Sequence, residues 1–68
     1  MSDARKLLAL RVRQARTDAD FTQSQLGSMT GHTKQWVSEV ERGSISPSFE
    51  AIVLIAKCCG KSTDFFTT

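Results

Sequence analysis

The sequence predicts an all-α fold, with one compact domain over residues 1–68 built from five helices. Apolar residues recur at helical spacing in three separate runs, and glycines and short polar segments separate these runs. No run alternates between apolar and polar residues for long enough to form a half-buried strand. A length of 68 residues is also that of a single small domain.

The first helix is expected over residues 4–16. Leu8, Val12 and Ala15 stand at i, i+4 and i+7, which places them in one apolar stripe, and arginines and lysines occupy most of the remaining surface. The helix ends in the poor helix formers of residues 17–20, where Asp20 tolerates a left-handed backbone conformation.

The second helix is expected to begin after Thr22. Thr22 and Gln25 have the spacing of a capping box, and Phe21 and Leu26 are the hydrophobic pair that flanks such a cap. This helix is short, because Gly31 favours a chain reversal soon afterwards.

Two further helices and a final turn complete the prediction. Thr33 is expected to cap a third helix over residues 34–42, which directs Val37 and Val40 inward. Ser48 is expected to cap a fourth helix, which ends at Gly60 and carries the apolar residues Phe49, Ile52, Val53, Ile55, Ala56 and Cys59. A last helical turn is expected over residues 62–66.

Composition limits the function classes. Nine Lys and Arg against seven Asp and Glu leave a net charge of +2, which excludes an acidic tail and a strongly cationic arm. The longest apolar stretch, residues 51–56, is far shorter than the ~20 residues that cross a bilayer. No secretory signal is recognisable, so no membrane partner is expected. The adjacent Cys58 and Cys59 cannot easily bridge each other, which predicts packing roles and a reduced, cytoplasmic location.

Catalytic chemistry finds no support in the sequence. His32 is the single histidine, and the chain has no Cys/His pairing at useful spacing, no phosphate-binding glycine loop and no cluster of carboxylates. We therefore expect no enzyme activity, catalytic residue, metal, cofactor or small-molecule ligand. A chain of 68 residues is also expected to leave no room for a separate sensing or cleavage domain. His32 lies in a turn, which is typical of a solvated side chain.

The most informative segment is residues 22–43. Two short helices are joined there by a four-residue turn, residues 30–33, and the small residue Gly27 stands where the helices would cross. This is the arrangement of a helix-turn-helix, in which the second helix enters the DNA major groove.

The chain resembles the lambda-repressor/Cro-like helix-turn-helix family, also called the xenobiotic-response-element family, and within it the small single-domain transcriptional regulators. The resemblance covers residues 8–66 and departs from the family at Asp20, where glycine is usual, and at Gly27, where alanine is usual. A glycine inside a helix costs roughly 0.5–1 kcal/mol relative to alanine. The matching residues are Val12-Arg13-Gln14-Ala15-Arg16, Phe21-Thr22-Gln23, Leu26, Gly31, Val37-Ser38, Val40-Glu41-Arg42-Gly43, Pro47-Ser48-Phe49-Glu50, Ile52, Ala56 and Gly60.

The resemblance implies a set of base-reading residues on the second helix of the motif. Lysine can donate to guanine and glutamine can pair with adenine, whereas an acid facing DNA must accept from cytosine or be neutralised. Polar residues that only keep an exposed face soluble are the alternative interpretation. The residues concerned are Lys34, Gln35, Ser38 and Glu39.

The resemblance also implies phosphate contacts and one ion pair. Two interpretations of Trp36 stay open: a phosphate contact at the edge of the motif, or a core residue next to Val40. Arg16 and Glu41 match family positions that form a salt bridge between the first and third helices, which makes Glu41 structural. The residues expected to contact phosphate are Thr22, Gln23, Thr33, Trp36, Arg42 and Ser44.

The sequence predicts a homodimer that binds double-stranded DNA. Family proteins pair so that two recognition helices meet successive major grooves ~34 Å apart on a palindromic operator. Since two adjacent aromatics cannot both point inward from one short turn, the dimer region is expected at residues 45–68, through Ile45, Val53, Phe65 and Phe66. The alternative is that Phe65 fills the core and Phe66 partly covers it. Phage or prophage repressors, restriction–modification controllers and antitoxins are such minimal regulators. The alternative is a protein-interaction module, an antitoxin or adaptor whose main partner is another protein.

Overall fold

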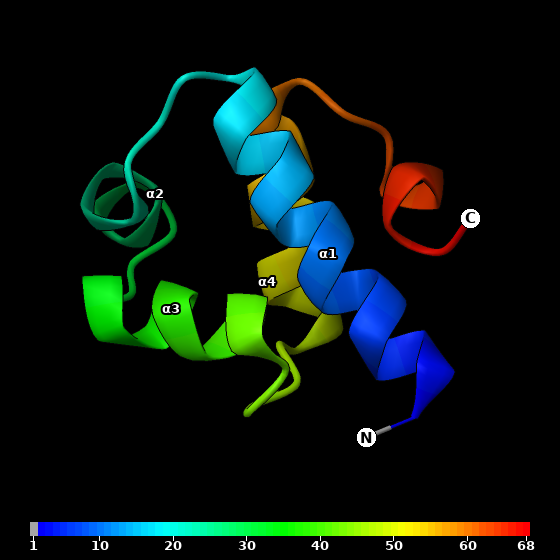
Figure 1. Ribbon diagram of the computed structural model, residues 1–68. Helices are drawn as coiled ribbons and strands as arrows, with labels where there is room; N and C mark the ends of the chain where they lie inside the picture. Colours follow the sequence, from blue (N-terminus) through cyan, green and yellow to red (C-terminus); the bar gives the residue numbers. More distant parts are fainter. Residues whose placement is uncertain (1) are drawn as a thin grey trace.

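The computed structural model describes residues 2–68 and contains, within them, four α-helices and one 3₁₀ turn (Figure 1). The order is α1 (Asp3–Asp18), α2 (Gln23–Met29), α3 (Lys34–Arg42), α4 (Phe49–Cys59) and η1 (Thr63–Phe66). The all-α prediction is confirmed, but the expected fifth helix is only a four-residue 3₁₀ turn. Ser62, the residue before this turn, does not form the side-chain cap hydrogen bond that begins each α-helix, and four residues are too few to propagate an α-helix.

Side-chain caps fix where the α-helices begin. Ser2, Thr22, Thr33 and Ser48 each accept a hydrogen bond from the backbone N–H three residues further along the chain. At Thr22 the bond is reciprocated by Gln25, whose side chain accepts from the Thr22 N–H at 2.8 Å, so the predicted capping box is present.

Residues in the left-handed conformation fix the breaks between helices. Gly43 and Gly60 end α3 and α4 with φ of 76° and 68°. Asp20 has φ of 61° in the link between α1 and α2, as its tolerance of this conformation predicted.

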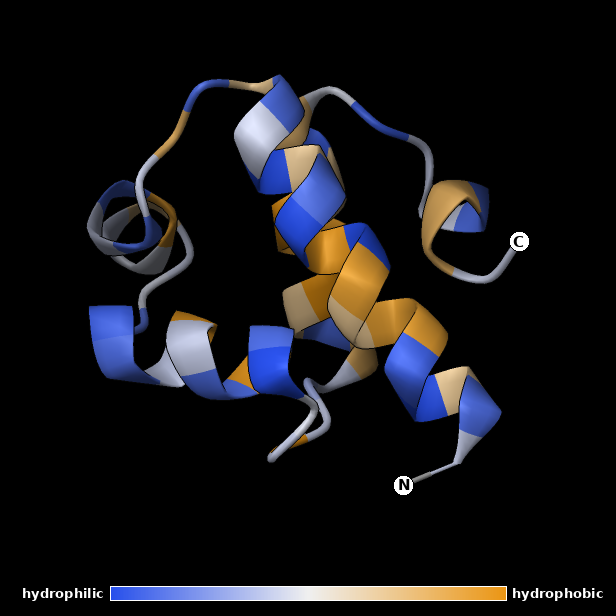
Figure 2. Cartoon of the chain, in the orientation of Figure 1, coloured by the Kyte–Doolittle hydropathy of each residue, from blue (hydrophilic) through white to orange (hydrophobic). Residues whose placement is uncertain are grey.

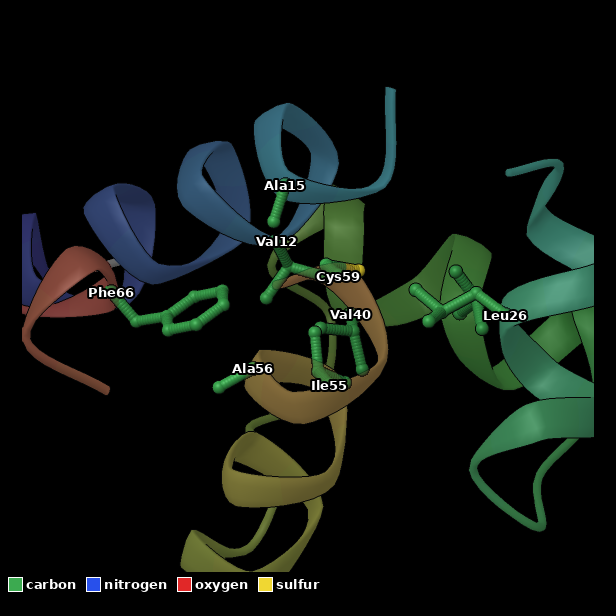
Figure 3. Close-up of a cluster of buried hydrophobic side chains, with 9 residues drawn as sticks. Val12, Ala15, Leu26, Val40, Ile55, Ala56, Cys59 and Phe66 are labelled. Atoms are coloured by element: carbon green, nitrogen blue, oxygen red, sulfur yellow. The ribbon is translucent and has the colours of Figure 1, made fainter. Parts of the chain in front are cut away.

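The core lies where α1 crosses α4, with α3 and η1 closing it from either side (Figures 1 and 3). Its fully buried members come from every element: Val12, Leu26, Val37, Val40, Ile55 and Phe66 are each at most 1 % exposed. In Figure 2, α1 and α4 show long hydrophobic stretches, whereas α3 is coloured mostly hydrophilic. The helix α3 is therefore held by a narrow apolar stripe and leaves the rest of its surface outside.

The aromatic pair in η1 corrects one prediction. Phe66 is 1 % exposed and points into the core, so it offers no surface to a second chain (Figure 3). Phe65 is half-buried and packs edge-on against Phe66, with ring centroids 5.3 Å apart. The cationic groups of Arg11 and Lys61 lie over the Phe65 ring at 5.2 and 4.8 Å. Both aromatics are thus occupied within the chain, because the tight 3₁₀ turn directs one inward and lays the other against it.

None of the helices within residues 2–68 combines the length and the apolarity that crossing a membrane requires.

Candidate nucleic-acid interface

The turn between α2 and α3 is built around a close approach of backbone to backbone. A Cβ placed on Gly27 would lie 2.7 Å from both the carbonyl carbon and the oxygen of Thr33, so no side chain fits there without a shift of the turn. The His32 N–H donates to the Gly27 carbonyl at 2.7 Å across the same contact. Gly31 completes the reversal with φ of 74°. Glycine at position 27 therefore costs helix propensity, as expected from the sequence. It also leaves the space that the close approach of the Thr33 backbone requires.

A buried ionic network ties α3 to the elements before it. The Arg16 guanidinium donates to both oxygens of Glu41, at 2.7 and 3.0 Å, and the Gln23 amide donates to the same carboxylate at 3.2 Å. Arg16 also donates to the Phe21 carbonyl at 2.9 Å. The side chains of Arg16 and Glu41 are only 14 % and 5 % exposed, so the predicted structural salt bridge is confirmed and is nearly removed from water.

The electrostatics of this network follow from its geometry. The hydrogen bond to Glu41 raises the pKa of Arg16 above its ordinary value, against the opposing effect of burial. The guanidinium therefore stays charged over the whole pH range in which a protein is folded. One carboxylate on α3 thus binds both the end of α1 and the start of α2, which fixes how α3 is presented.

The four predicted base-reading residues share the outward side of α3. Lys34 and Gln35 are exposed in the first turn, and Ser38 and Glu39 are half-buried one turn later. The Gln35 amide donates to the Glu39 carboxylate at 3.3 Å, which links the two side chains on the surface. Because Val37 and Val40 are buried on the opposite side, α3 cannot rotate this polar face away from solvent.

An aromatic stack marks the start of α3 and was not foreseen. The rings of His32 and Trp36 lie parallel, with centroids 3.6 Å apart and planes 7° apart. Trp36 is half-buried and also packs against the edge of the core, which agrees with the core interpretation made for it. The spacing of four residues between His32 and Trp36 is the only sequence signal for this stack. His32 precedes the start of α3, where helical geometry does not set side-chain directions, so the spacing alone does not predict the contact.

The remaining predicted phosphate contacts lie around the ends of α2 and α3. Thr22, Thr33, Arg42 and Ser44 are exposed, and both threonines keep a hydroxyl hydrogen to donate, because each accepts its capping bond through the oxygen. Gln23 is different, since its amide group is already engaged with Glu41. This engagement orients Gln23 and was not predicted from the sequence.

The charge of this region is balanced. Residues 22–43 contain Lys34 and Arg42 as bases and Glu39 and Glu41 as acids. Since Glu41 is neutralised by Arg16 from α1, the exposed surface of the motif carries two bases and one acid. The local field therefore favours an anion weakly, and recognition must depend on hydrogen bonding as much as on charge.

Comparison with known proteins decides the family. The profile of the helix-turn-helix family matches residues 12–66. The chain belongs to the lambda-repressor/Cro-like helix-turn-helix family. It is a DNA-binding transcriptional regulator of this family, whose membership points to a non-enzymatic protein. The matched residues include the Arg16, Gln23 and Glu41 network, the turn between α2 and α3, and the whole of α3.

A solved structure supports the same assignment. The fold is similar to the crystal structure of the clp gene regulator ClgR from Corynebacterium glutamicum, with a TM-score of 0.86 and 25 % sequence identity. The similarity covers 93 % of this chain and 67 % of that chain. No match was found among curated protein sequences.

Within residues 2–68 no three His, Cys, Asp or Glu side chains gather in a way that would hold a metal ion. Cys58 is half-buried and Cys59 is buried, both as free thiols, and burial raises the pKa of Cys59. A buried thiol with a raised pKa is poorly nucleophilic, which fits the packing role expected for it.

Proposed function

We propose that this regulator reads its operator with the outward face of α3 laid in the major groove. Lys34 and Gln35 contact base edges from the first turn, and Ser38 and Glu39 extend the contact one turn further. The observation that carries the proposal is the division of α3 into two faces. One face is locked to the core by Val37, Val40 and the Glu41 network, and the other presents only polar side chains.

Phosphate contacts position α3 in the groove. The exposed threonine hydroxyls and the side chains of Arg42 and Ser44 surround the base-reading face and reach the backbone on either side of it. Because few of these groups are charged, nonspecific affinity is modest and most of the selectivity comes from base contacts. The full set assigned to phosphate is Thr22, Gln23, Thr33, Trp36, Arg42 and Ser44, in which Gln23 donates the amide hydrogen that Glu41 does not accept.

The regulator acts as a homodimer on a palindromic operator. One recognition helix contacts too few base pairs to be selective, whereas two related helices meet half-sites one turn, ~34 Å, apart. The class of regulator that fits best is a phage or prophage repressor, a restriction–modification controller or an antitoxin that represses its own operon.

Selection of binding sites from random double-stranded DNA tests the proposal. Wild-type protein should enrich an inverted repeat with half-site centres about one helical turn apart. The double variant Lys34→Ala with Gln35→Ala should stay folded and lose this enrichment. The double variant Lys6→Ala with Gln14→Ala removes the same residue types from α1 and should retain it. Enrichment of the same repeat by the Lys34/Gln35 variant would refute the readout assignment.

A second candidate function is a protein-interaction module, an antitoxin or adaptor with DNA contact secondary. The exposed apolar side chains of Phe49 and Leu54 favour it, since they are 73 % and 43 % exposed. The two functions differ in salt dependence. DNA binding that releases counterions weakens steeply as salt rises, and each phosphate contact neutralised by Lys or Arg adds ~0.9 to the slope. DNA affinity insensitive to salt would favour the second candidate.

A further inference from the structure

The outer face of α4 carries a charged and apolar pattern that the DNA-binding surface does not use. Glu50, Val53, Leu54 and Lys57 stand at i, i+3, i+4 and i+7, so they form one stripe along the helix, here called the α4 stripe. Glu50, Leu54 and Lys57 are exposed and Val53 is half-buried. The stripe faces away from the core, because Ile55 and its buried neighbours occupy the opposite side.

Phe49 widens the apolar part of this surface. It is 73 % exposed at the first position of α4 and lines an open groove of about 300 Å³ together with Glu50, Val53 and Leu54. Large apolar side chains grouped on one surface of a small domain mark a site of association. The exposed Leu10 on α1 provides a contrast, since it does not line this groove.

The charges at the two ends of the stripe identify its occupant. An acid, Glu50, stands at the start, a base, Lys57, stands at the end, and the apolar pair lies midway between them. We propose that the α4 stripe pairs with the α4 stripe of a second copy of this chain, as antiparallel helices about a two-fold axis. In this register Glu50 faces Lys57 of the partner subunit, and Val53 faces Leu54 of the partner subunit.

Two-fold symmetry makes each of these contacts occur twice. A parallel arrangement would instead place like charges together, Glu50 against Glu50 of the partner subunit. This inference rests on the proposed homodimer, and it moves the interface from the C-terminal aromatics to α4. Val53 is shared with the interface predicted from the sequence, whereas Phe66 is replaced because it is buried.

The surface that the α4 stripe offers is small for a stable dimer interface. A standard interface covers ~800 Å² on each partner. The accessible surface of the chain is 4097 Å², so such an interface would take about a fifth of it. One face of an 11-residue helix supplies less than that. The free protein therefore dimerises weakly, and the pair is completed when two copies bind adjacent half-sites.

Charge reversal tests the register by sedimentation equilibrium of DNA-free protein, from about 10 μM to 1 mM to bracket that weak affinity. Glu50→Lys alone and Lys57→Glu alone each place like charges across the axis twice and should weaken dimerisation about tenfold. The double variant Glu50→Lys with Lys57→Glu restores opposite charges and should recover most of the wild-type association. Within one chain the two residues are seven apart and not in contact, so only pairing between chains predicts this recovery.

Two variants that replace an exposed leucine by glutamate, one inside the α4 stripe and one outside it, provide a matched comparison. Leu54→Glu should abolish dimerisation, whereas Leu10→Glu, also at an exposed leucine, should leave it unchanged. Circular dichroism of each variant checks that the fold is retained. A wild-type protein that is monomeric throughout this range, or a double variant no better than the single ones, would overturn the proposal.

The DNA-binding function is tested separately, so the two failures are distinguishable. A monomeric protein that still selects one half-site would sink the α4 interface and leave readout by α3 standing. A dimer with the expected charge pattern that selects no DNA sequence would overturn readout by α3 and leave the α4 interface standing. Stable 1:1 binding of a different protein that Leu54→Glu abolishes, with no self-association, would assign the surface to that partner and overturn the self-pairing.

Discussion

Removing the charge of Glu41 is expected to destabilise the protein more than any other single change of charge. Glu41→Gln keeps the size of the side chain but leaves the Arg16 guanidinium, which donates to Glu41 at 2.7 and 3.0 Å, facing a neutral amide. The two side chains are 14 % and 5 % exposed, so water replaces little of the lost interaction. Breaking one side of such a buried pair costs ~3–5 kcal/mol of unfolding free energy.

That loss is large compared with the total stability of a chain this short. At ~0.05–0.15 kcal/mol per residue, a 68-residue domain has roughly 3–10 kcal/mol to lose. Each kcal/mol lowers the melting temperature of a domain of this size by ~4–8 °C. Glu41→Gln should therefore melt well over ten degrees lower or be largely unfolded in the absence of denaturant.

Urea denaturation followed by far-ultraviolet circular dichroism measures the loss directly, and the more exposed ion pair between Lys61 and Asp18 serves as the control. Asp18→Asn removes the Lys61–Asp18 pair, which spans 3.3 Å with side chains 27 % and 49 % exposed, and should cost under ~1 kcal/mol. Adding Arg16→Met to Glu41→Gln should recover part of the loss, because the buried charge is then gone. Equal small losses for Glu41→Gln and Asp18→Asn would refute the reasoning.

Three further outcomes are expected. Gly27→Ala should lower the free energy of unfolding by ~1–2 kcal/mol despite its better helix propensity, because the added Cβ would sit 2.7 Å from the Thr33 backbone; a more stable variant in urea titration would show that the turn shifts easily. Phe66→Ala should cost ~3–5 kcal/mol, and a loss under ~1 kcal/mol would place Phe66 outside the core. Burial raises the pKa of Cys59, so iodoacetamide should modify Cys59 more slowly in native than in urea-unfolded protein at mildly alkaline pH. For the same reason, the contribution of this thiol to stability should fall as the pH rises past 9.0, the ordinary pKa of a cysteine. Equal alkylation rates in the two states would contradict it.

Local signals predicted most of the fold. The threonine caps, the capping box at Thr22, and the turns at Asp20 and Gly60 depend on residues within a few positions of each other, so the sequence alone identifies them. The Arg16–Glu41 pair is separated by 25 positions, and only the family resemblance indicated it. Periodicity carries no information within a single turn, which is why the inward direction of Phe66 was missed.

The surface was harder to predict than the core. The apolar residues of α4 occupy much of its circumference, so the sequence did not reveal which side would face out, and the role of Phe49 and Leu54 depended on knowing it. The link from Gln23 to Glu41 and the stacking of His32 on Trp36 arise from tertiary placement, which no spacing rule specifies. The residues that the resemblance implies as base-reading do lie on the outward side of α3, because Val37 and Val40 define its inner side.

The most direct test of readout by α3 is a ratio of affinities. Fluorescence anisotropy at one fixed salt concentration would give dissociation constants for the selected operator and for a scrambled duplex of the same composition. The wild-type ratio should be at least ~10³, and in the Lys34→Ala with Gln35→Ala variant the two constants should approach each other, through loss of operator affinity. A variant that binds all DNA more weakly but keeps the wild-type ratio would contradict base reading by these residues.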